Sequence, residues 1–130
     1  FLEGLFMCGA SFSGRPVEGS EHFMYYYFDE LDDRRFNHGK VIALNTLIAL
    51  KLHGDRKFVP LEPIKKFFDK VGIAYKPADS GISRQEFIQM FLNIKDFVEK
   101  RDLPYSILNE LDFKEDSKEL NEILDWIFNL

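Results

Sequence analysis

The sequence has few of the features that stabilise small secreted domains or carry a chain across a membrane. It contains one cysteine, Cys8, among 130 residues, so an internal disulfide is excluded and a reducing cytoplasm is the expected compartment. No apolar run reaches the ~18 residues that a membrane span requires. Glu3 interrupts the apolar N-terminal residues and no basic segment precedes them, which argues against a signal peptide.

An excess of basic residues is also missing. The 22 acidic residues outnumber the 17 Lys and Arg, and the net charge of -5 argues against a nucleic-acid partner, because phosphate binding needs clustered cations. The 45% hydrophobic residues, with 14 Phe among them, exclude a disordered chain and predict one domain with a substantial core. Because the chain starts at Phe1 inside an apolar pattern, we expect it to be a piece of a longer protein.

Hydrophobic periodicity predicts an all-α fold, a multi-helix bundle of roughly six or seven helices without convincing strands or internal repeats. Capping residues support several boundaries. Ser20 and Asn37 are candidate N-caps, and Gly54 is expected to end a helix. Residues 83–86 and 116–119 both match a capping box. The apolar segments lie at residues 2–12, 23–28, 41–52, 60–71, 87–98 and 120–128, with a shorter one at 106–111.

Two of these segments allow more specific predictions. Residues 41–52 are apolar almost all round, which is typical of a central, buried helix. Residues 60–71 instead show one apolar face, expected to turn inward and to end at Gly72. Pro77 and Gly81 are expected to mark a loop. The predicted inward face of 60–71 consists of Leu61, Ile64, Phe67, Phe68 and Val71.

The residues with most chemical potential are His22 and His38, which fall in the first turns of two predicted helices. The positive end of a helix disfavours imidazolium, so both rings are biased toward the neutral form that binds metals. One interpretation is that they share a catalytic metal ion. The other is that each is an ordinary residue near a helix cap, because their spacing matches no compact metal motif. The spacing alone leaves both open.

Other residues near the two histidines or at helix ends can also be assigned either a functional or a structural role. Glu21 could hold a metal-binding histidine in place, although the helix dipole favours a first-turn Glu without such a role. Tyr25, Tyr26 and Tyr27 must point in different directions, and we expect them to pack rather than to transfer protons. His53 lies at a helix C-terminus, where the dipole favours it structurally.

Several short motifs together resemble a known family, the C-terminal helical domain of glycerol-1-phosphate dehydrogenases. These enzymes fall within the iron-containing alcohol dehydrogenase and dehydroquinate synthase-like superfamily. The resemblance implies that residues 1–130 form a single helical metal- and substrate-binding domain, the C-terminal half of a dehydroquinate synthase-like fold, with its N-terminal nucleotide-binding domain absent. The motifs are Arg15-Pro16, Gly19-Ser20-Glu21-His22, His38-Gly39-Lys40-Val41, Thr46-Leu47, Leu52-His53-Gly54 and the run from Arg101 to Leu108.

The resemblance implies which residues of this chain bind a metal and which reaction the full protein catalyses. His22 and His38 would bind a divalent metal, zinc first, with iron or nickel as alternatives. Arg15, a cation in the loop at residues 13–19, is the candidate to bind a substrate anion, and the alternative is an ordinary solvated arginine. The third metal ligand, an Asp, and the NAD(P) site would lie in the missing domain. The substrate would be a small polyol or triose phosphate. The chain alone would be inactive. Assembly of the full protein as a homo-oligomer is compatible with the resemblance. No catalytic residue is assigned within this chain.

Three departures from the family pattern keep a second function open. Val17-Glu18 stands where the family tends to have Ala-Ser, and the added carboxylate would repel a phosphate. Residues 42–45 are bulkier than usual, and Lys40 stands where the family often has Glu or Gln. The alternative is a diverged, non-catalytic helical module that packs against a partner.

Overall fold

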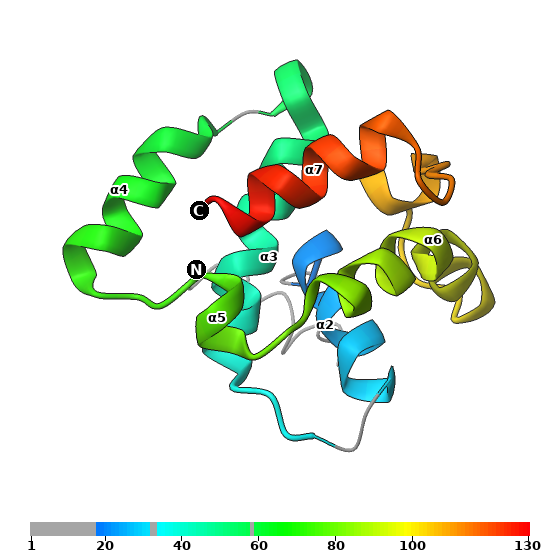
Figure 1. The fold of residues 1–130 in the computed structure, drawn as a ribbon, viewed down its shortest axis with the longest axis horizontal. Coiled ribbons are helices and arrows are strands. Elements are labelled where there is room, and N and C mark those ends of the chain that lie inside the picture. The colour runs from blue at the N-terminus through cyan, green and yellow to red at the C-terminus, as the bar shows by residue number, and fades with distance from the viewer. Residues whose placement is uncertain (1–17, 32–33, 58) are drawn as a thin grey trace, which may run out of the picture.

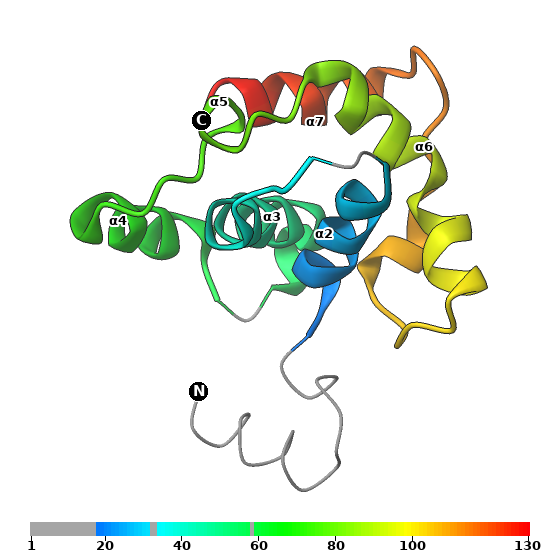
Figure 2. The same cartoon turned by 90° about the horizontal axis from the view of Figure 1, so that it is seen from below.

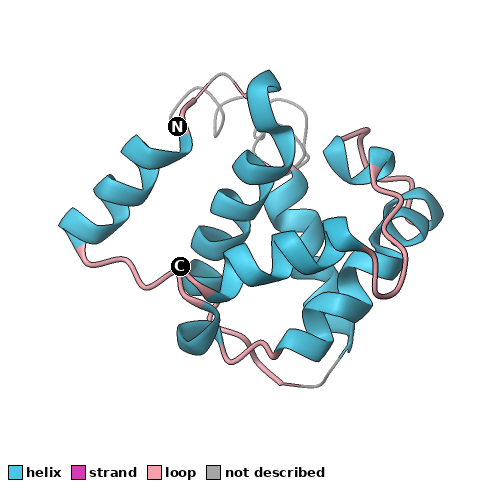
Figure 3. Cartoon of the chain, turned by 45° about the horizontal axis from the view of Figure 1, so that its top comes forward, coloured by secondary structure: helices cyan, strands magenta, loops and turns pink. Residues whose placement is uncertain are grey.

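The computed structural model describes residues 18–31, 34–57 and 59–130 (Figure 1). Within these ranges the chain is helical, with six α-helices and no strand, so the all-α prediction is confirmed (Figure 3). The expected helix at 2–12 lies outside the described residues. The helices are α2 (Ser20–Leu31), α3 (His38–His53), α4 (Leu61–Val71), α5 (Pro77–Ser80), α6 (Arg84–Lys100) and α7 (Lys118–Phe128), with 3-10 turns η2 (Gly54–Arg56) and η3 (Ile107–Glu110).

The central helix is α3, as its apolar sequence predicts. It contacts α2, α4 and α5, and Figure 2 shows α2 and α3 side by side beneath the layer that contains α7. The side chain of Asn37 caps α3 by accepting a hydrogen bond from the Lys40 amide at 3.2 Å. Gly54 ends the helix with a positive φ of 54°, a conformation that glycine adopts without strain. Both boundary predictions are confirmed.

The main core lies between α2, α3, α6 and α7. On α2, Phe23 and Phe28 are buried, and the Phe28 ring meets Phe87 of α6 edge-on with centroids 5.2 Å apart. The capping box predicted for α6 is present. The hydroxyl of Ser83 accepts from the Glu86 amide at 3.3 Å, and the Glu86 carboxylate accepts from the Ser83 amide at 2.7 Å. None of the described helices is long and apolar enough to span a membrane.

The predictions for residues 77–80 and 116–119 are wrong. Residues 77–80, expected in a loop, form the short helix α5, because Pro77 suits the first helical position and Gly81 closes the turn at φ 72°. The box expected at 116–119 is replaced by a simple cap, in which the Ser117 hydroxyl accepts from the Leu120 amide at 3.2 Å. In each case the sequence identified the residues that begin or end the segment, but not the backbone and capping geometry that they adopt.

Helix α4 is amphipathic as predicted, but only part of its apolar face is covered. Leu61, Ile64 and Phe68 pack against a small cluster formed by Ala43, Leu47 and Tyr75. Phe67 and Val71, expected to face inward, are 54% and 51% exposed. In Figure 1 this helix stands apart from the rest of the bundle.

The two adjacent phenylalanines of α4 should therefore differ in their effect on stability. We expect Phe68→Ala to lower the free energy of unfolding by about 2 kcal/mol, since its ring packs against α3 and lies 5.9 Å from that of Tyr75. Phe67→Ala should change it by less than about 0.5 kcal/mol, as for other surface positions. Urea denaturation of both variants checks this, and equal losses would show that Phe67 is covered in solution.

Candidate functional site

The site begins with the tight first turn of α2. The carbonyl of Gly19 accepts hydrogen bonds from the amides of His22 and Phe23, both at 3.0 Å. Gly19 thus occupies the cap position, one residue before the predicted Ser20. The Glu21 carboxylate reaches back and accepts from the Gly19 amide at 3.2 Å. A Cβ at position 19 would lie 2.9 Å from this carboxylate, so any larger residue there would displace Glu21.

Glu21 also fixes the orientation of the neighbouring imidazole. Nδ1 of His22 donates to Oε1 of Glu21 at 3.0 Å. A neutral ring that donates from Nδ1 keeps Nε2 free as a ligand atom, which is the usual arrangement around histidine-bound metals. Of the two explanations for Glu21, this contact favours the orienting role.

The two candidate metal ligands lie next to each other. The ring centroids of His22 and His38 are 5.4 Å apart with an interplanar angle of 52°. His22 comes from α2 and is half-buried, whereas His38 opens α3 and is exposed. Both rings lie in the first turns of their helices, as the sequence indicates, and tertiary packing brings these two turns together.

Two tyrosines of α2 border the histidine pair. The Tyr25 ring meets His38 edge-on at a centroid distance of 4.8 Å, and the Tyr26 ring lies 6.4 Å from that of His22. Burial, together with a hydrogen bond to Glu18, raises the pKa of Tyr26 to about 12. Burial and the nearby Asp29 carboxylate raise the pKa of Tyr25. Both phenols therefore stay protonated at neutral pH and serve as walls.

Val17 and Glu18 depart from the family pattern, and Glu18 is the one of the two that lies within the described residues. Its carboxylate accepts a hydrogen bond from the Tyr26 phenol, which places a negative charge on the face of α2 that carries His22. Arg15, the predicted substrate-binding residue, lies outside the described residues, as does Val17. The substrate-binding prediction for Arg15 stays a prediction.

A polar residue that the sequence did not single out lies beneath the site. Asn45 is fully buried between α3 and α2, and its Nδ2 donates to the Glu21 carbonyl at 2.9 Å. Among the described residues, its Oδ1 atom has no hydrogen-bond partner. In the sequence Asn45 only interrupts an apolar segment, and nothing local indicates that it reaches the turn that holds His22.

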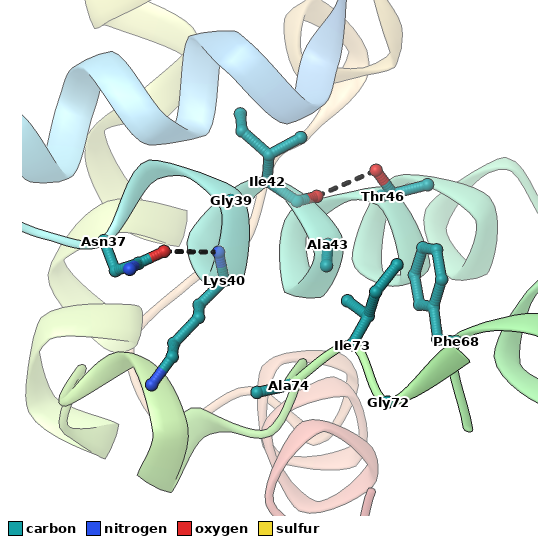
Figure 4. Close-up of a pocket in the computed structure, with 10 residues that line it drawn as sticks. All are labelled: Asn37, Gly39, Lys40, Ile42, Ala43, Thr46, Phe68, Gly72, Ile73 and Ala74. Atoms are coloured by element: carbon teal, nitrogen blue, oxygen red, sulfur yellow. Dashed lines mark hydrogen bonds between the residues drawn. The ribbon is translucent and has the colours of Figure 1, made fainter. Parts of the chain in front are cut away.

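An apolar pocket of about 470 Å³ lies on another side of α3, between it and the end of α4 (Figure 4). Lys40 is its cationic residue, and its side chain extends from α3 toward α5. His22 and His38 are not among the residues that line it. Lys40 therefore belongs to this pocket and not to the histidine pair. Figure 4 labels the lining residues: Asn37, Gly39, Lys40, Ile42, Ala43, Thr46, Phe68, Gly72, Ile73 and Ala74.

A second pocket, of about 410 Å³, brings together four of the motifs noted in the sequence. Its lining includes residues 19–21 of the first turn of α2, Thr46 and His53 of α3, and Tyr105 with Ser106. Ser106 also caps η3, because its hydroxyl accepts from the Leu108 amide at 3.3 Å. These motifs thus lie around one pocket beside the turn that carries Glu21 and His22.

The donor set fits part of a metal site. Two imidazoles at this separation, one of them oriented by a carboxylate, suit a divalent ion such as zinc. Among residues 18–31, 34–57 and 59–130, no group of three His, Cys, Asp or Glu side chains lies close enough to hold a metal ion. The described part of the chain therefore offers two ligands.

Comparison with known proteins identifies the class to which this helical domain is related. Over 86 residues, 66% of this chain, it is 34% identical to the glycerol-1-phosphate dehydrogenase (NAD(P)+) of Staphylothermus marinus, of which it covers 23%. The enzyme of the same name from Thermoplasma volcanium is 27% identical over 105 residues, 81% of this chain and 28% of the relative. That from Saccharolobus islandicus is 32% identical over 81 residues, 62% of this chain and 22% of the relative.

The chain is therefore homologous to glycerol-1-phosphate dehydrogenases over most of its length, and the resemblance stated from its motifs is confirmed. It spans about a quarter of the length of these curated relatives. No family model matches the chain, and no solved structure matches it significantly.

Proposed function

We propose that this chain is the metal- and substrate-binding domain of an NAD(P)-dependent oxidoreductase of the glycerol-1-phosphate dehydrogenase type. The observation that carries the proposal is the pairing of His22 and His38, whose ring centroids lie 5.4 Å apart at the starts of two adjacent helices. Glu21 supports it by holding His22 through Nδ1. The similarity to dehydrogenases that use NAD(P)+ supplies the reaction class.

In this proposal His22 and His38 hold a divalent ion, with zinc the first choice, and a third ligand comes from a further domain. The bound metal would supply a Lewis acid for the substrate oxygen during hydride transfer. Within the chain, Glu21 orients one ligand, and Tyr25 and Tyr26 border the pair. NAD(P) would bind to the further domain, the substrate would be a small polyol or triose phosphate, and the compartment would be the cytoplasm.

A chelation experiment on the full-length protein tests this function. We expect prolonged treatment with a chelator to remove at least 90% of NAD(P)H-dependent reduction of a triose phosphate, because a Lewis acid contributes several kcal/mol to such a step. Added Zn²⁺ should restore the rate. The absence of any nicotinamide-linked reduction before chelation would instead favour the alternative of a non-catalytic helical module.

The same assay addresses the substrate charge. Glu18 carries a negative charge on the His22 face of α2, so a phosphorylated substrate needs a nearby cation. Arg15 is our proposal for that cation. An assay with an uncharged polyol beside the triose phosphate distinguishes these substrate classes directly.

A further inference from the structure

Asn45 is a buried polar residue between the two helices that carry the histidines. Asn45 lies seven residues after His38 on α3, nearly two helical turns, so both side chains leave the same face of the helix about 10.5 Å apart. At the far end of this span, its Nδ2 donates to the Glu21 carbonyl of α2 at 2.9 Å. This hydrogen bond therefore ties the first turn of α2 to a fixed position along the axis of α3.

The contacts of Glu21 pass this constraint on to His22. The backbone of Glu21 is held by Asn45, and its carboxylate is held by the Gly19 amide at 3.2 Å and by Nδ1 of His22 at 3.0 Å. A shift of the first turn along α3 would move His22 relative to His38. The position of α2 along the axis of α3 thus determines the separation of the two rings.

Asn45 is a poor choice if stability alone is considered. Its Oδ1 is buried and finds no hydrogen-bond partner in the part of the chain that the structure describes, which is normally destabilising. The Glu21 carbonyl lies inside α2, where the helix itself supplies a donor, so it does not depend on Asn45. A leucine, which has the same branched shape and the same number of side-chain heavy atoms, would remove the unpartnered acceptor and leave no new one.

We propose that Asn45 is a positioning residue. It fixes the position of α2 along the axis of α3 and thereby the separation of His22 and His38. The proposal rests on the proposed metal function and deepens it. It differs from a purely structural role because stability and metal affinity should respond differently when Asn45 is replaced.

The test is Asn45→Leu in the full-length protein, titrated with Co²⁺ and followed by the absorption of the bound ion. We expect an affinity roughly 10–100-fold weaker, the usual cost of removing a group that orients metal ligands. The melting temperature should be unchanged or higher. An unchanged affinity, or a loss accompanied by a proportionate fall in melting temperature, overturns the proposal.

Leu47→Ala provides the matched control on the same helix. Leu47 is fully buried, but it belongs to the separate cluster with Ala43 and Tyr75 that faces α4. This variant should melt at a lower temperature and keep the Co²⁺ affinity. A weaker affinity in Leu47→Ala as well would show that any loss of packing disturbs the site, and Asn45 would then have no special role.

A metal-free measurement separates this proposal from the proposed function. The amides of His22 and Phe23 donate to the Gly19 carbonyl, so their hydrogen exchange reports on the first turn of α2. We expect faster exchange at both amides in Asn45→Leu and wild-type rates in Leu47→Ala. If His22→Ala and His38→Ala leave Co²⁺ binding intact, the metal function fails. The role of Asn45 in fixing the turn is then decided by exchange alone, and unchanged rates overturn it.

Discussion

His38→Ala is expected to reduce the metal content of the full-length protein from one divalent ion per chain to nearly none. The imidazole of His38 is one of the two ligands proposed within the described residues, which contain no group of three His, Cys, Asp or Glu side chains that could hold an ion instead. Loss of the metal removes several kcal/mol of transition-state stabilisation, so nicotinamide-linked turnover should fall roughly 10³-fold or more. Elemental analysis and steady-state kinetics measure the two effects.

The matched control is His53→Ala, which removes the same side chain from the other end of α3. His53 lines the pocket near Tyr105 and Ser106, and among the described residues no hydrogen bond, ion pair or ring contact joins it to His22 or His38. Metal content should stay at one ion per chain in this variant. A His38→Ala protein that retains its full metal content would contradict the shared-metal site, whatever happens to its activity.

Phe28→Ala is expected to have the largest effect on stability, a loss of about 3–5 kcal/mol in the free energy of unfolding. The Phe28 side chain is fully buried, and its ring lies 5.2 Å from Phe87 and 6.4 Å from Phe36. Its removal opens a cavity between α2 and α6 that rigid helices cannot close. Because many domains are stable by only about 5–15 kcal/mol, the variant should be close to unfolding.

Urea denaturation of Phe28→Ala beside Phe67→Ala measures this effect under matched conditions. Both changes remove the same ring, but Phe67 is 54% exposed on α4. A loss below about 1 kcal/mol for Phe28→Ala would mean that α2 and α6 do not pack in solution as the structure shows.

Most of the helical framework could be predicted from the sequence, because periodicity and caps are local properties. The capping box of Ser83 and Glu86 and the ends of α3 and α4 at Gly54 and Gly72 follow directly from residue types. Helix α5 was missed because Pro77 and Gly81 favour both a loop and a single helical turn. Four residues contain too little periodicity to distinguish these structures.

Tertiary arrangement accounts for the remaining errors. The apolar face of α4 was identified, but periodicity shows that a face exists and not whether a neighbour covers it, so the exposure of Phe67 and Val71 was not foreseen. Asn45 was missed for a related reason. Its partner, the Glu21 carbonyl, lies 24 residues earlier in the chain, and only the packing of α2 on α3 brings them together.

The candidate site could be located only in part from residue chemistry. The positions of His22 and His38 near helix starts were predictable, but their spacing did not favour a shared metal over two ordinary residues. The resemblance to glycerol-1-phosphate dehydrogenases raised the pair to a hypothesis, and the structure adds the distance between the rings. The role of Glu21 becomes clear only when its bond to Nδ1 is known.

X-ray absorption at the zinc edge of the zinc-loaded full-length protein tests the shared metal most directly. We predict two imidazole nitrogens in the first coordination sphere at about 2.0–2.1 Å in the wild-type protein, and a bound-zinc signal close to background in both His22→Ala and His38→Ala. A spectrum with no imidazole contribution, or one that neither substitution changes, would contradict the central claim that these two histidines hold one metal ion.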